Sequence, residues 1–296
     1  MSKILLIDGF NMAFRAFYAV RELSRSDGFP TNALYGWVRS LWKLVDEHSP
    51  RESIVFFDLG GAQAKLALLP EYKANRAETP EEFSKQIPII KELTRAMGFG
   101  VYEENGVESD DLLAAYGKRI TDRDPTAEIL IVSADKDFAQ SVNERTHMLL
   151  PPPTANPRLG WRRLDPEGVK EKFGVTAEQM VDYLSLIGDS SDNIAGVPGV
   201  GPKTAVKWLL EYGDLDDIQA NAAELKPPRF REILPELADR MKINRQIIGF
   251  DMSCGPEFVE AGQLDLGTLF KLLETMEMKT HLEEARKRYA QGELMF

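Results

Sequence analysis

The sequence predicts an α/β fold with a central, mostly parallel β-sheet flanked by helices. Three runs of the 296-residue chain are apolar and rich in β-branched or aromatic residues: ILLID ending at Asp8, SIVFFD ending at Asp58 and EILIVSAD ending at Asp135. Nearly continuous apolar runs are typical of strands that are buried on both faces, as in a parallel sheet. Helical stretches lie between these runs, and such alternation indicates the α/β class.

A weaker fourth run, GFGVYEE, precedes Glu108, and a helix is expected directly after it. The apolar face of that helix is formed by Leu112, Ala115, Tyr116 and Ile120. Ser109 is the expected N-cap, and Asp110 and Asp111 fall in the first turn, where the helix dipole favours anions. An isolated pair of such acids usually only caps a helix, but Glu108 adds a third acid here.

Two further segments divide the chain. Residues 60–97 are polar and rich in charge, and one or two amphipathic helices are expected there, because the segment is too long for a simple connection. The loop PPPTANP at 151–157 cannot form a helix or a central strand. We expect it to mark the approximate boundary between a sheet-rich part and a helical C-terminal part.

Nine acidic residues gather at five places where a predicted strand ends or a helix begins. They are Asp8, Asp58, Glu108, Asp110, Asp111, Asp135, Asp137, Asp189 and Asp192. The carboxyl ends of parallel strands are where open α/β sheets bind ligands. So many carboxylates in one crevice repel each other unless cations are bound, and two Mg²⁺ ions about 4 Å apart are a common device for cutting phosphodiesters. The pattern predicts a metal-dependent nuclease.

The composition and the net charge limit which classes of protein are compatible with this prediction. Hydrophobic residues make up 43% and charged residues 28% of the chain, as in a globular protein with an ample core. The net charge of −11 argues against a nucleic-acid partner, but it falls to −2 without the nine acids, so the acidity is local. The single cysteine, Cys254, excludes a disulfide framework and favours a cytoplasmic protein. No apolar stretch is long enough to span a membrane.

A glycine-rich turn follows the last pair of acids. The sequence GDSSDNIAGVPGVGPKTA at 188–205 places Asp189 and Asp192 three residues apart and then gives Gly196, Gly199, Gly201, Pro202 and Lys203. Glycines let backbone N–H groups approach a phosphate closely, and a lysine beside a helix N-terminus suits an anion. The alternative is a tight turn between packed helices. The same loop could hold K⁺ through its carbonyl groups.

These motifs together resemble the flap endonuclease superfamily of 5′ nucleases, most closely the 5′→3′ exonuclease region of bacterial DNA polymerase I in a free-standing form. The matching segments are LIDGFNMAFRAF at 6–17, FFD at 56–58, LPEYKANR at 69–76, ESDDLLA at 108–114, SADKDFAQ at 133–140 and residues 186–205. The resemblance implies a PIN-like nuclease core at 1–175 with a helical arch at about 70–97. It also implies a helical DNA-binding region at 176–296, with a helix–three-turn–helix element at about 180–212.

The resemblance also implies roles. Two Mg²⁺ (or Mn²⁺) ions would hydrolyse DNA phosphodiesters, one held mainly by Asp8, Asp58, Glu108, Asp110 and Asp111, the other by Asp135, Asp137, Asp189 and Asp192. Arg15, Lys73 and Arg76 would lie at the substrate phosphate. For Arg15 the alternative is a salt bridge to a nearby acid, and for Lys73 and Arg76 a solvated helix face. Tyr72 would stack on an unpaired base or simply pack under the arch.

The expected DNA contacts beyond the reaction centre are Gly199, Gly201, Lys203, Thr204 and Lys207. Recognition is expected to follow structure (a 5′ flap, a nick or a 5′ end, possibly an RNA primer on DNA), with 5′→3′ exonuclease and flap endonuclease activity in replication and repair. A monomer in the cytoplasm, associated with the nucleoid and linked in function to a polymerase and a ligase, is implied. Two alternatives stay open: a metal-dependent phosphatase or RNase, and a module that binds branched DNA without cutting it.

Overall fold

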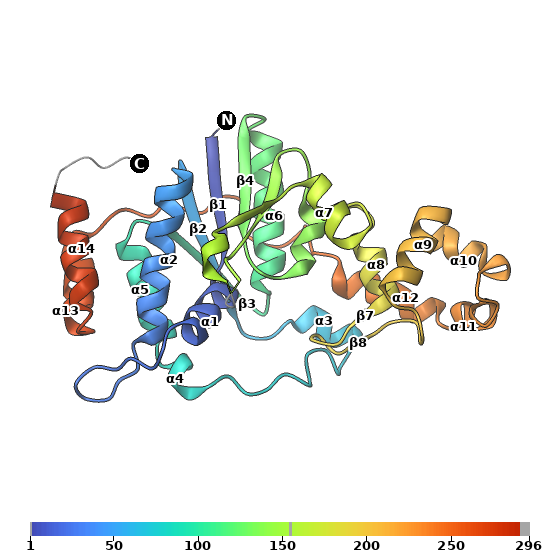
Figure 1. Cartoon of the computed structure of the whole chain (residues 1–296), viewed down its shortest axis with the longest axis horizontal. Coiled ribbons are helices and arrows are strands. Elements are labelled where there is room, and N and C mark those ends of the chain that lie inside the picture. The colour runs from blue at the N-terminus through green and yellow to red at the C-terminus, as the bar shows by residue number, and fades with distance from the viewer. Residues whose placement is uncertain (1, 154–155, 291–296) are drawn as a thin grey trace.

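A six-stranded sheet forms the centre of the molecule (Figure 1). The computed structural model describes residues 2–153 and 156–290. The strands are β1 (Ser2–Asp8), β2 (Glu52–Leu59), β3 (Gly100–Asn105), β4 (Ala127–Val132), β5 (Thr146–Leu150) and β6 (Arg162–Leu164). They lie in the order β3-β2-β1-β4-β5-β6, and only β6 runs antiparallel to its neighbour. The predicted mostly parallel sheet is therefore confirmed.

Both faces of the sheet are buried, which explains the unbroken apolar runs. In β1, Leu5 and Ile7 face one core and Ile4 and Leu6 face the other. The first core is covered by α1 (Gly9–Ala19), α2 (Asn32–His48) and α5 (Ile87–Ala96), and the second by α6 (Ser109–Arg123). Side chains alternate along a strand, so helices on two sides require every residue of β1 from Ile4 to Ile7 to be apolar.

The strand order creates a crevice at one edge of the sheet. From β1 the chain proceeds outward through β2 and β3, and then returns to the other side of β1 with β4 and β5. The order therefore reverses between β1 and β4, and ligands of open α/β sheets bind at such a point, beyond the carboxyl ends of the strands. Asp8 ends β1, and Asp135 follows β4 by three residues, so both lie at this point.

The proline-rich loop is not the boundary that the sequence suggested. After it, the chain forms β6, which pairs with β5, and α7 (Pro166–Phe173). The sheet therefore continues past the loop, because Arg162–Leu164 pairs with β5 and covers what would otherwise be an open edge of the sheet. Between β4 and β5 lies the short 3₁₀-helix η1 (Lys136–Ser141).

A group of helices extends from the sheet at one end of the elongated molecule, on the right in Figure 1. It contains α8 (Met180–Ile187), a hairpin of β7 (Gly188–Asp189) and β8 (Ile194–Ala195), α9 (Pro202–Tyr212), α10 (Leu215–Ala220), 3₁₀-helix η3 (Ala222–Glu224), α11 (Phe230–Glu236) and α12 (Ala238–Ile248). Trp208 and Phe230 are fully buried among these helices.

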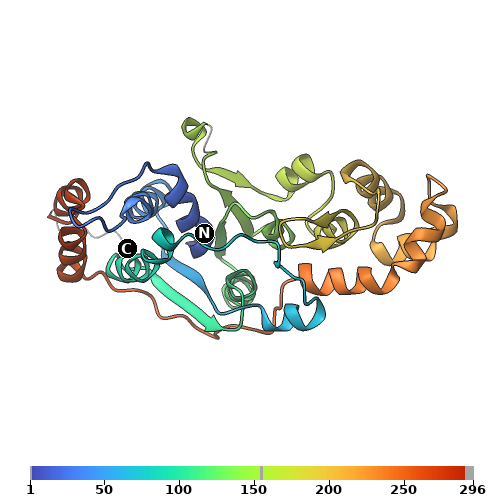
Figure 2. The same ribbon diagram turned by 90° about the horizontal axis from the view of Figure 1, so that it is seen from below.

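The last two helices lie at the opposite end of the molecule. After α12 the chain runs back along the core to α13 (Leu266–Thr275) and α14 (Lys279–Ala290), as Figure 2 shows from below. These helices pack on α2 and α5, and the Trp42 indole N–H donates to the Tyr289 hydroxyl at 3.2 Å. The predicted helical region 176–296 is thus split, with only α8–α12 beside the hairpin.

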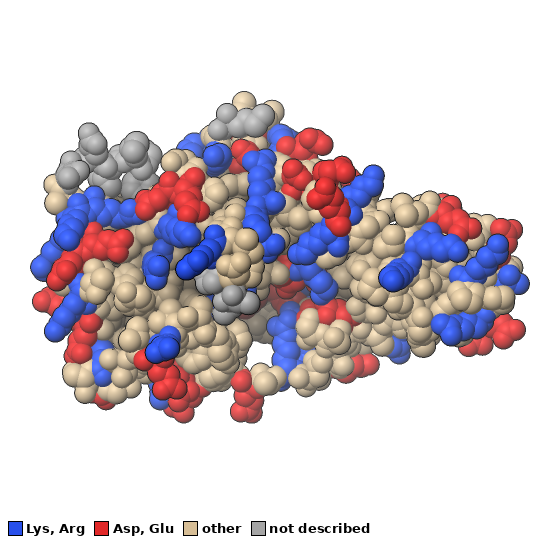
Figure 3. Space-filling model, viewed as in Figure 1, with Lys and Arg blue, Asp and Glu red and all other residues tan. Residues whose placement is uncertain are grey.

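The segment expected to form an arch has mixed structure. It contains α4 (Glu81–Ser84) and α5, follows α3 (Gln63–Leu68), and has turns or no regular structure at residues 69–80. Ile90 and Leu93 of α5 are fully buried against the sheet, so α5 belongs to the core. The connection between α3 and α4 crosses the bottom of Figure 1, and Figure 3 shows an opening in the surface between it and the body of the molecule.

Candidate metal centre and DNA interface

Three strand-end carboxylates occupy the crevice. Asp8 caps α1, accepting from the backbone N–H of Asn11 at 3.2 Å, and it accepts from the Ser133 hydroxyl at 2.8 Å. Asp58 accepts from the backbone N–H of Ser109 at 2.8 Å, which ties β2 to the start of α6. Burial raises the pKa of Asp8 to about 7, and the charges of Asp58 and Asp135 add to this shift.

Glu108, Asp110 and Asp111 form the first acidic group, at the start of α6. Their carboxylate oxygens lie within 4.8 Å of one another. Glu108, rather than the predicted Ser109, is the N-cap residue, because its backbone is extended and Ser109 is already the first residue of the helix. Burial raises the pKa of Asp110 and of Asp111. Burial alone would also raise the pKa of Glu108, but the charges of Lys65 and Lys73 outweigh it and hold the pKa at about 2.

Asp137, Asp189 and Asp192 form the second acidic group, again with oxygens within 4.8 Å. Asp137 lies in η1, and the β7–β8 hairpin brings the other two acids to it. Lys136 pairs with Asp189 and lies 3.4 Å from Oδ1 of Asp137. That oxygen is buried and accepts no hydrogen bond from the described part of the chain. Burial raises the pKa of Asp137 to about 7, with the charge of Asp135 adding to the shift.

Tyr72 and Lys73 join the two acidic groups. The Tyr72 hydroxyl is within hydrogen-bond distance of Glu108 at 3.1 Å and of Asp192 at 3.2 Å, and the Lys73 ammonium contacts the same two carboxylates. The Tyr72 ring is 5% exposed, so in this conformation it packs at the base of the segment and has no free face for a base. This burial agrees with the packed alternative, and the contact of Tyr72 with an unpaired base stays a prediction.

The other two predicted phosphate ligands differ in their contacts. Arg76 pairs with Asp192 at 2.5 Å, so it is not merely a solvated side chain. Arg15 donates to the backbone carbonyl of Pro152 at 2.8 Å. Within residues 2–153 and 156–290 it makes no salt bridge, so the alternative reading of Arg15 was wrong: a backbone carbonyl, not an acid, is its partner.

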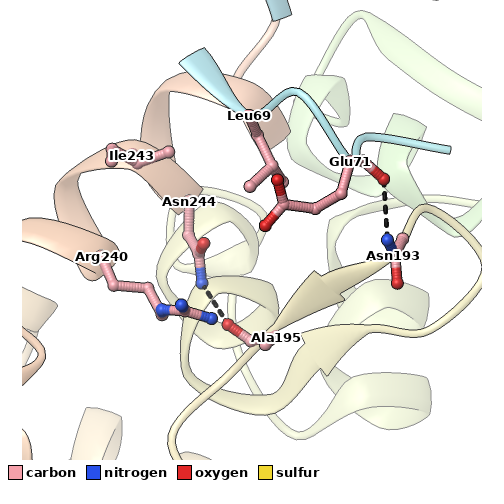
Figure 4. Close-up of a pocket in the computed structure, with 7 residues that line it drawn as sticks. All are labelled: Leu69, Glu71, Asn193, Ala195, Arg240, Ile243 and Asn244. Atoms are coloured by element: carbon pink, nitrogen blue, oxygen red, sulfur yellow. Dashed lines mark hydrogen bonds between the residues drawn. The ribbon is translucent and has the colours of Figure 1, made fainter. Parts of the chain in front are cut away.

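Two asparagines fix the hairpin that carries the second acidic group. The Asn193 amide donates to the Glu71 carbonyl at 2.7 Å, and the buried Asn244 of α12 donates to the Ala195 carbonyl at 2.9 Å (Figure 4). Both contacts lie at a cavity of about 300 Å³. The hairpin is thereby tied to the start of the expected arch segment on one side and to α12 on the other, which places Asp192 beside Tyr72 and Lys73.

The glycine-rich turn leads into α9, whose first residue is Pro202 as expected. Gly199 has a φ of 79°, a left-handed conformation that favours glycine. Gly201 is the N-cap of α9, and Thr204 donates its backbone N–H to the Gly201 carbonyl at 3.0 Å. Lys203 and Lys207 are exposed one turn apart. Figure 3 shows basic and acidic side chains mixed on the visible face of this end.

Sequence reasoning missed two cations of the site. Lys136 stands between Asp135 and Asp137, and this position was a usable signal. Lys65 pairs with Glu108 at 2.8 Å and Asp111 at 3.1 Å, but α3 is far from these acids in sequence and no local pattern predicts the contact. Burial alone would lower the pKa of Lys65, but the charges of Asp110 and Glu108 raise it, so the ammonium is charged.

The donor set fits divalent cations. Each group offers three carboxylate oxygens, the hard ligands that Mg²⁺ and Mn²⁺ take, and one buried oxygen of Asp137 lacks a hydrogen bond. With both groups at the carboxyl edge of the sheet, the arrangement is suited to binding a phosphodiester between cations.

Metal affinity is expected to depend on pH. Asp8 and Asp137, with pKa values of about 7, are mostly protonated at pH 6 and mostly ionised at pH 8. Because a carboxylate must lose its proton to bind metal, Mn²⁺ affinity should rise by about ten-fold or more across this range, with proton release on binding. Calorimetric titration in buffers of different protonation enthalpy measures both, and a pH-independent affinity without proton release would contradict the expectation.

Comparison with known proteins agrees with this site. Models of the 5′-3′ exonuclease N-terminal resolvase-like domain and of the 5′-3′ exonuclease C-terminal SAM fold match residues 3–174 and 175–261. A 5′-3′ exonuclease of Aquifex aeolicus is 32% identical over 99% of this chain and 98% of its own length. The thermostable DNA polymerase I of Thermus thermophilus is 35% identical over 95% of this chain, which spans 33% of that polymerase. DNA polymerase I of Bacillus subtilis is 36% identical over 83% of this chain, and the match covers 27% of the length of that polymerase.

Together the two matched regions define the class of the protein, a 5′-3′ exonuclease. The chain belongs to the 5′-3′ exonuclease family. The predicted nuclease function is confirmed at the level of this family. No helix in the described residues is both long and apolar enough to cross a membrane.

Solved structures show the same fold. A bacteriophage T5 5′-exonuclease with bound zinc has a TM-score of 0.70 at 22% identity, covering 98% of both chains. The catalytic core of Rad2 in complex with a DNA substrate has a TM-score of 0.63 at 15% identity, covering 95% of this chain and 91% of that one. The predicted nuclease fold is thereby confirmed.

Proposed function

We propose that this chain is a structure-specific 5′ nuclease that hydrolyses DNA phosphodiesters with two Mg²⁺ (or Mn²⁺) ions, acting as a 5′→3′ exonuclease and 5′-flap endonuclease. The main support is the pair of acidic groups, each with three oxygens within 4.8 Å, that Tyr72 and Lys73 connect at the crevice. Bound divalent ions supply a water of lowered pKa and stabilise the attacking and leaving oxygens of an in-line displacement.

The acids divide between the two ions according to their grouping. Glu108, Asp110 and Asp111, with Asp8 and Asp58 beside them, would hold one ion. Asp137, Asp189 and Asp192, with Asp135, would hold the other. The assignment of the outer acids follows their position at the strand ends, where the charge of Asp58 adds to the raised pKa of Asp8.

Three basic side chains are proposed to bind the substrate phosphate. Lys73 and Arg76 form ion pairs with carboxylates that would bind the metal ions. Their side chains are 21% and 52% exposed. When these carboxylates bind metal, the two cations lose their partners and are free to contact a phosphate at the same place. Arg15, bonded to a single carbonyl, adds a third cation across the crevice.

The glycine-rich turn and α9 are proposed to hold the DNA duplex. Backbone N–H groups of Gly199 and Gly201 and the side chains of Lys203, Thr204 and Lys207 would contact one phosphate strand. Since phosphate contacts carry no sequence information, recognition would follow the shape of the DNA. The arch, from about residue 70, would receive the free 5′ end, and the opening beside the α3–α4 connection is a suitable passage.

Replacing Lys203 with Met is expected to weaken duplex binding equally for all sequences and to reduce the slope of log K against log salt by about one. Lys203 is exposed and has no acidic partner among the described residues, so its loss should not affect folding. Anisotropy titrations at several salt concentrations measure the slope. Lys43→Met, on α2 and 45% exposed, is the matched control. A slope unchanged from that of the control would remove Lys203 from the interface.

A K⁺ ion at the glycine-rich turn is a further element of the proposal. Carbonyl groups of this turn would bind it between the protein and the DNA phosphate. DNA affinity should therefore be higher in K⁺ than in Na⁺ at equal ionic strength, and identical affinities in the two salts would contradict this part.

The proposed activity is tested with 5′-flap, nicked, single-stranded and blunt DNA, each with and without Mg²⁺, and with an RNA primer on DNA. Cutting of the flap and nicked substrates only with Mg²⁺ is expected. Hydrolysis of a small phosphomonoester without DNA cleavage would favour a phosphatase instead, and metal-independent binding without cleavage would favour a binding module. Primer or flap removal beside a polymerase and a ligase, by a cytoplasmic, nucleoid-associated monomer, is the cellular role we propose.

A further inference from the structure

Four basic side chains neutralise the two acidic groups, and they differ in how far they can move. The side chains of Lys73, Arg76 and Lys136 are 21%, 52% and 36% exposed, so each can turn toward solvent or substrate. The Lys65 side chain is 9% exposed. Lys65 belongs to α3, which packs against α12, and it is the most buried of the four cations.

Lys65 contacts all three acids of the first group. Its Nζ lies 2.8 Å from Glu108, 3.1 Å from Asp111 and 3.8 Å from Asp110. These distances put the positive charge among the same oxygens that form a candidate metal site. A buried charge that is separated from its partners is strongly disfavoured, so the buried Lys65 ammonium is held among these acids.

We propose that Lys65 is a resident cation of the first acidic group, which stays in place when a divalent ion binds and sets how tightly that ion is held. This inference rests on the two-metal function proposed above. Three carboxylates, one ammonium and one divalent ion carry no net charge together, so the group with Lys65 accepts one divalent ion and disfavours a second. Lys65 is thus a positioning residue: it holds Glu108 and Asp111 together before metal binds, at the cost of repulsion toward the metal.

The test measures Mn²⁺ binding rather than activity. Free Mn²⁺ is followed by electron paramagnetic resonance in titrations of the metal-free full chain, for wild type, Lys65→Met and Lys65→Arg. Lys65→Met removes the charge and keeps the apolar stem, so it should bind Mn²⁺ about ten-fold more tightly or more, as expected for loss of a like charge within a few ångströms. Lys65→Arg keeps the charge and should match wild type within about two-fold.

Thermal unfolding gives a second readout. In EDTA, Lys65→Met should melt at a lower temperature than wild type because its carboxylates lose their counter-ion, and Mn²⁺ should raise its melting temperature by more. If Lys65→Met is unfolded in EDTA, it is refolded with Mn²⁺. The chelator concentration needed to remove Mn²⁺ is then compared between this variant and wild type. The same ten-fold difference is expected. Lys118→Met, on an exposed part of α6 where Lys118 pairs with Asp122, is the control.

The outcomes separate this inference from the proposed function. Equal Mn²⁺ binding by wild type and Lys65→Met would overturn the role of Lys65 alone. Equally tightened binding in Lys65→Arg and Lys65→Met would also overturn it, since space rather than charge would then be the cause. A chain that binds no Mn²⁺ in any form would overturn the two-metal proposal, and the resident cation with it.

Discussion

Asp137→Asn is expected to abolish DNA cleavage while leaving the metal-free protein at least as stable as wild type. The change removes one charged oxygen from the second acidic group. Loss of a supporting contact at a metal site costs about 10–100-fold in affinity or activity, so loss of a ligand should exceed 100-fold. Cleavage of a labelled 5′-flap substrate in Mg²⁺ measures the activity.

The stability part follows from the pKa of Asp137. The Asp137 carboxyl has a pKa of about 7 in the folded chain, above its pKa in the unfolded chain. It therefore stabilises the folded chain fully at pH values below the unfolded pKa, and this contribution is lost as the pH rises through 7. At pH 8 the ionised, buried group is therefore a cost that Asn lacks. In EDTA at pH 8 the variant should gain on the order of 1 kcal/mol in unfolding free energy.

Asp239→Asn, at an acid whose side chain is 97% exposed, should change neither activity nor stability and is the control. Wild-type cleavage by Asp137→Asn would remove Asp137 from the metal site. A large loss of stability in EDTA would show that the carboxylate supports the fold rather than opposing it.

Gly196→Ala, directly after β8, is expected to destabilise the protein strongly. A Cβ on Gly196 would lie 2.4 Å from the backbone nitrogen of Gly188 and 2.5 Å from the carbonyl oxygen of Leu186. These are backbone atoms of the hairpin and α8, which cannot move aside as a flexible side chain can. The unfolding free energy should fall by about 3 kcal/mol, the upper range for overpacking, as measured by denaturant titration.

Gly201→Ala is the matched control in the same turn. A Cβ there meets no atom within 4 Å, so the cost should stay below about 1 kcal/mol, the usual difference at an N-cap. The control also reports on function: if the backbone at Gly201 approaches a DNA phosphate, the variant folds normally and binds duplex more weakly. Equal stability of the two variants would contradict the crowding at Gly196.

The acids could be located from sequence because they depend on local features. Asp8 and Asp58 end strands that the apolar runs define, and parallel strands share one carboxyl edge, so their proximity follows from the fold class. The first turn of α6 likewise fixes Asp110 and Asp111 relative to each other. The glycine-rich turn was recognised from the residues that its backbone requires.

The partners of these acids could not be located in the same way, because they depend on tertiary packing. Lys65 of α3 meets Glu108 at the start of α6 through tertiary packing, and Asn244 meets the hairpin through the packing of α12 on α8. Tyr72 shows the same limit: Lys73 follows it in sequence, but its hydroxyl turns inward to two buried acids. The boundary expected at residues 151–157 failed because a three-residue edge strand is too short to be recognised.

The return of the chain to α13 and α14 has a consequence for fragments of this protein. Leu269 and Leu273 of α13 are fully buried beside Ile90 and Leu93 of α5, although the family regions meet at residues 174 and 175. A break at that junction leaves each half lacking a surface that only the other supplies. Neither half should be recovered in native form by itself, whereas the two expressed together should reassociate by complementation.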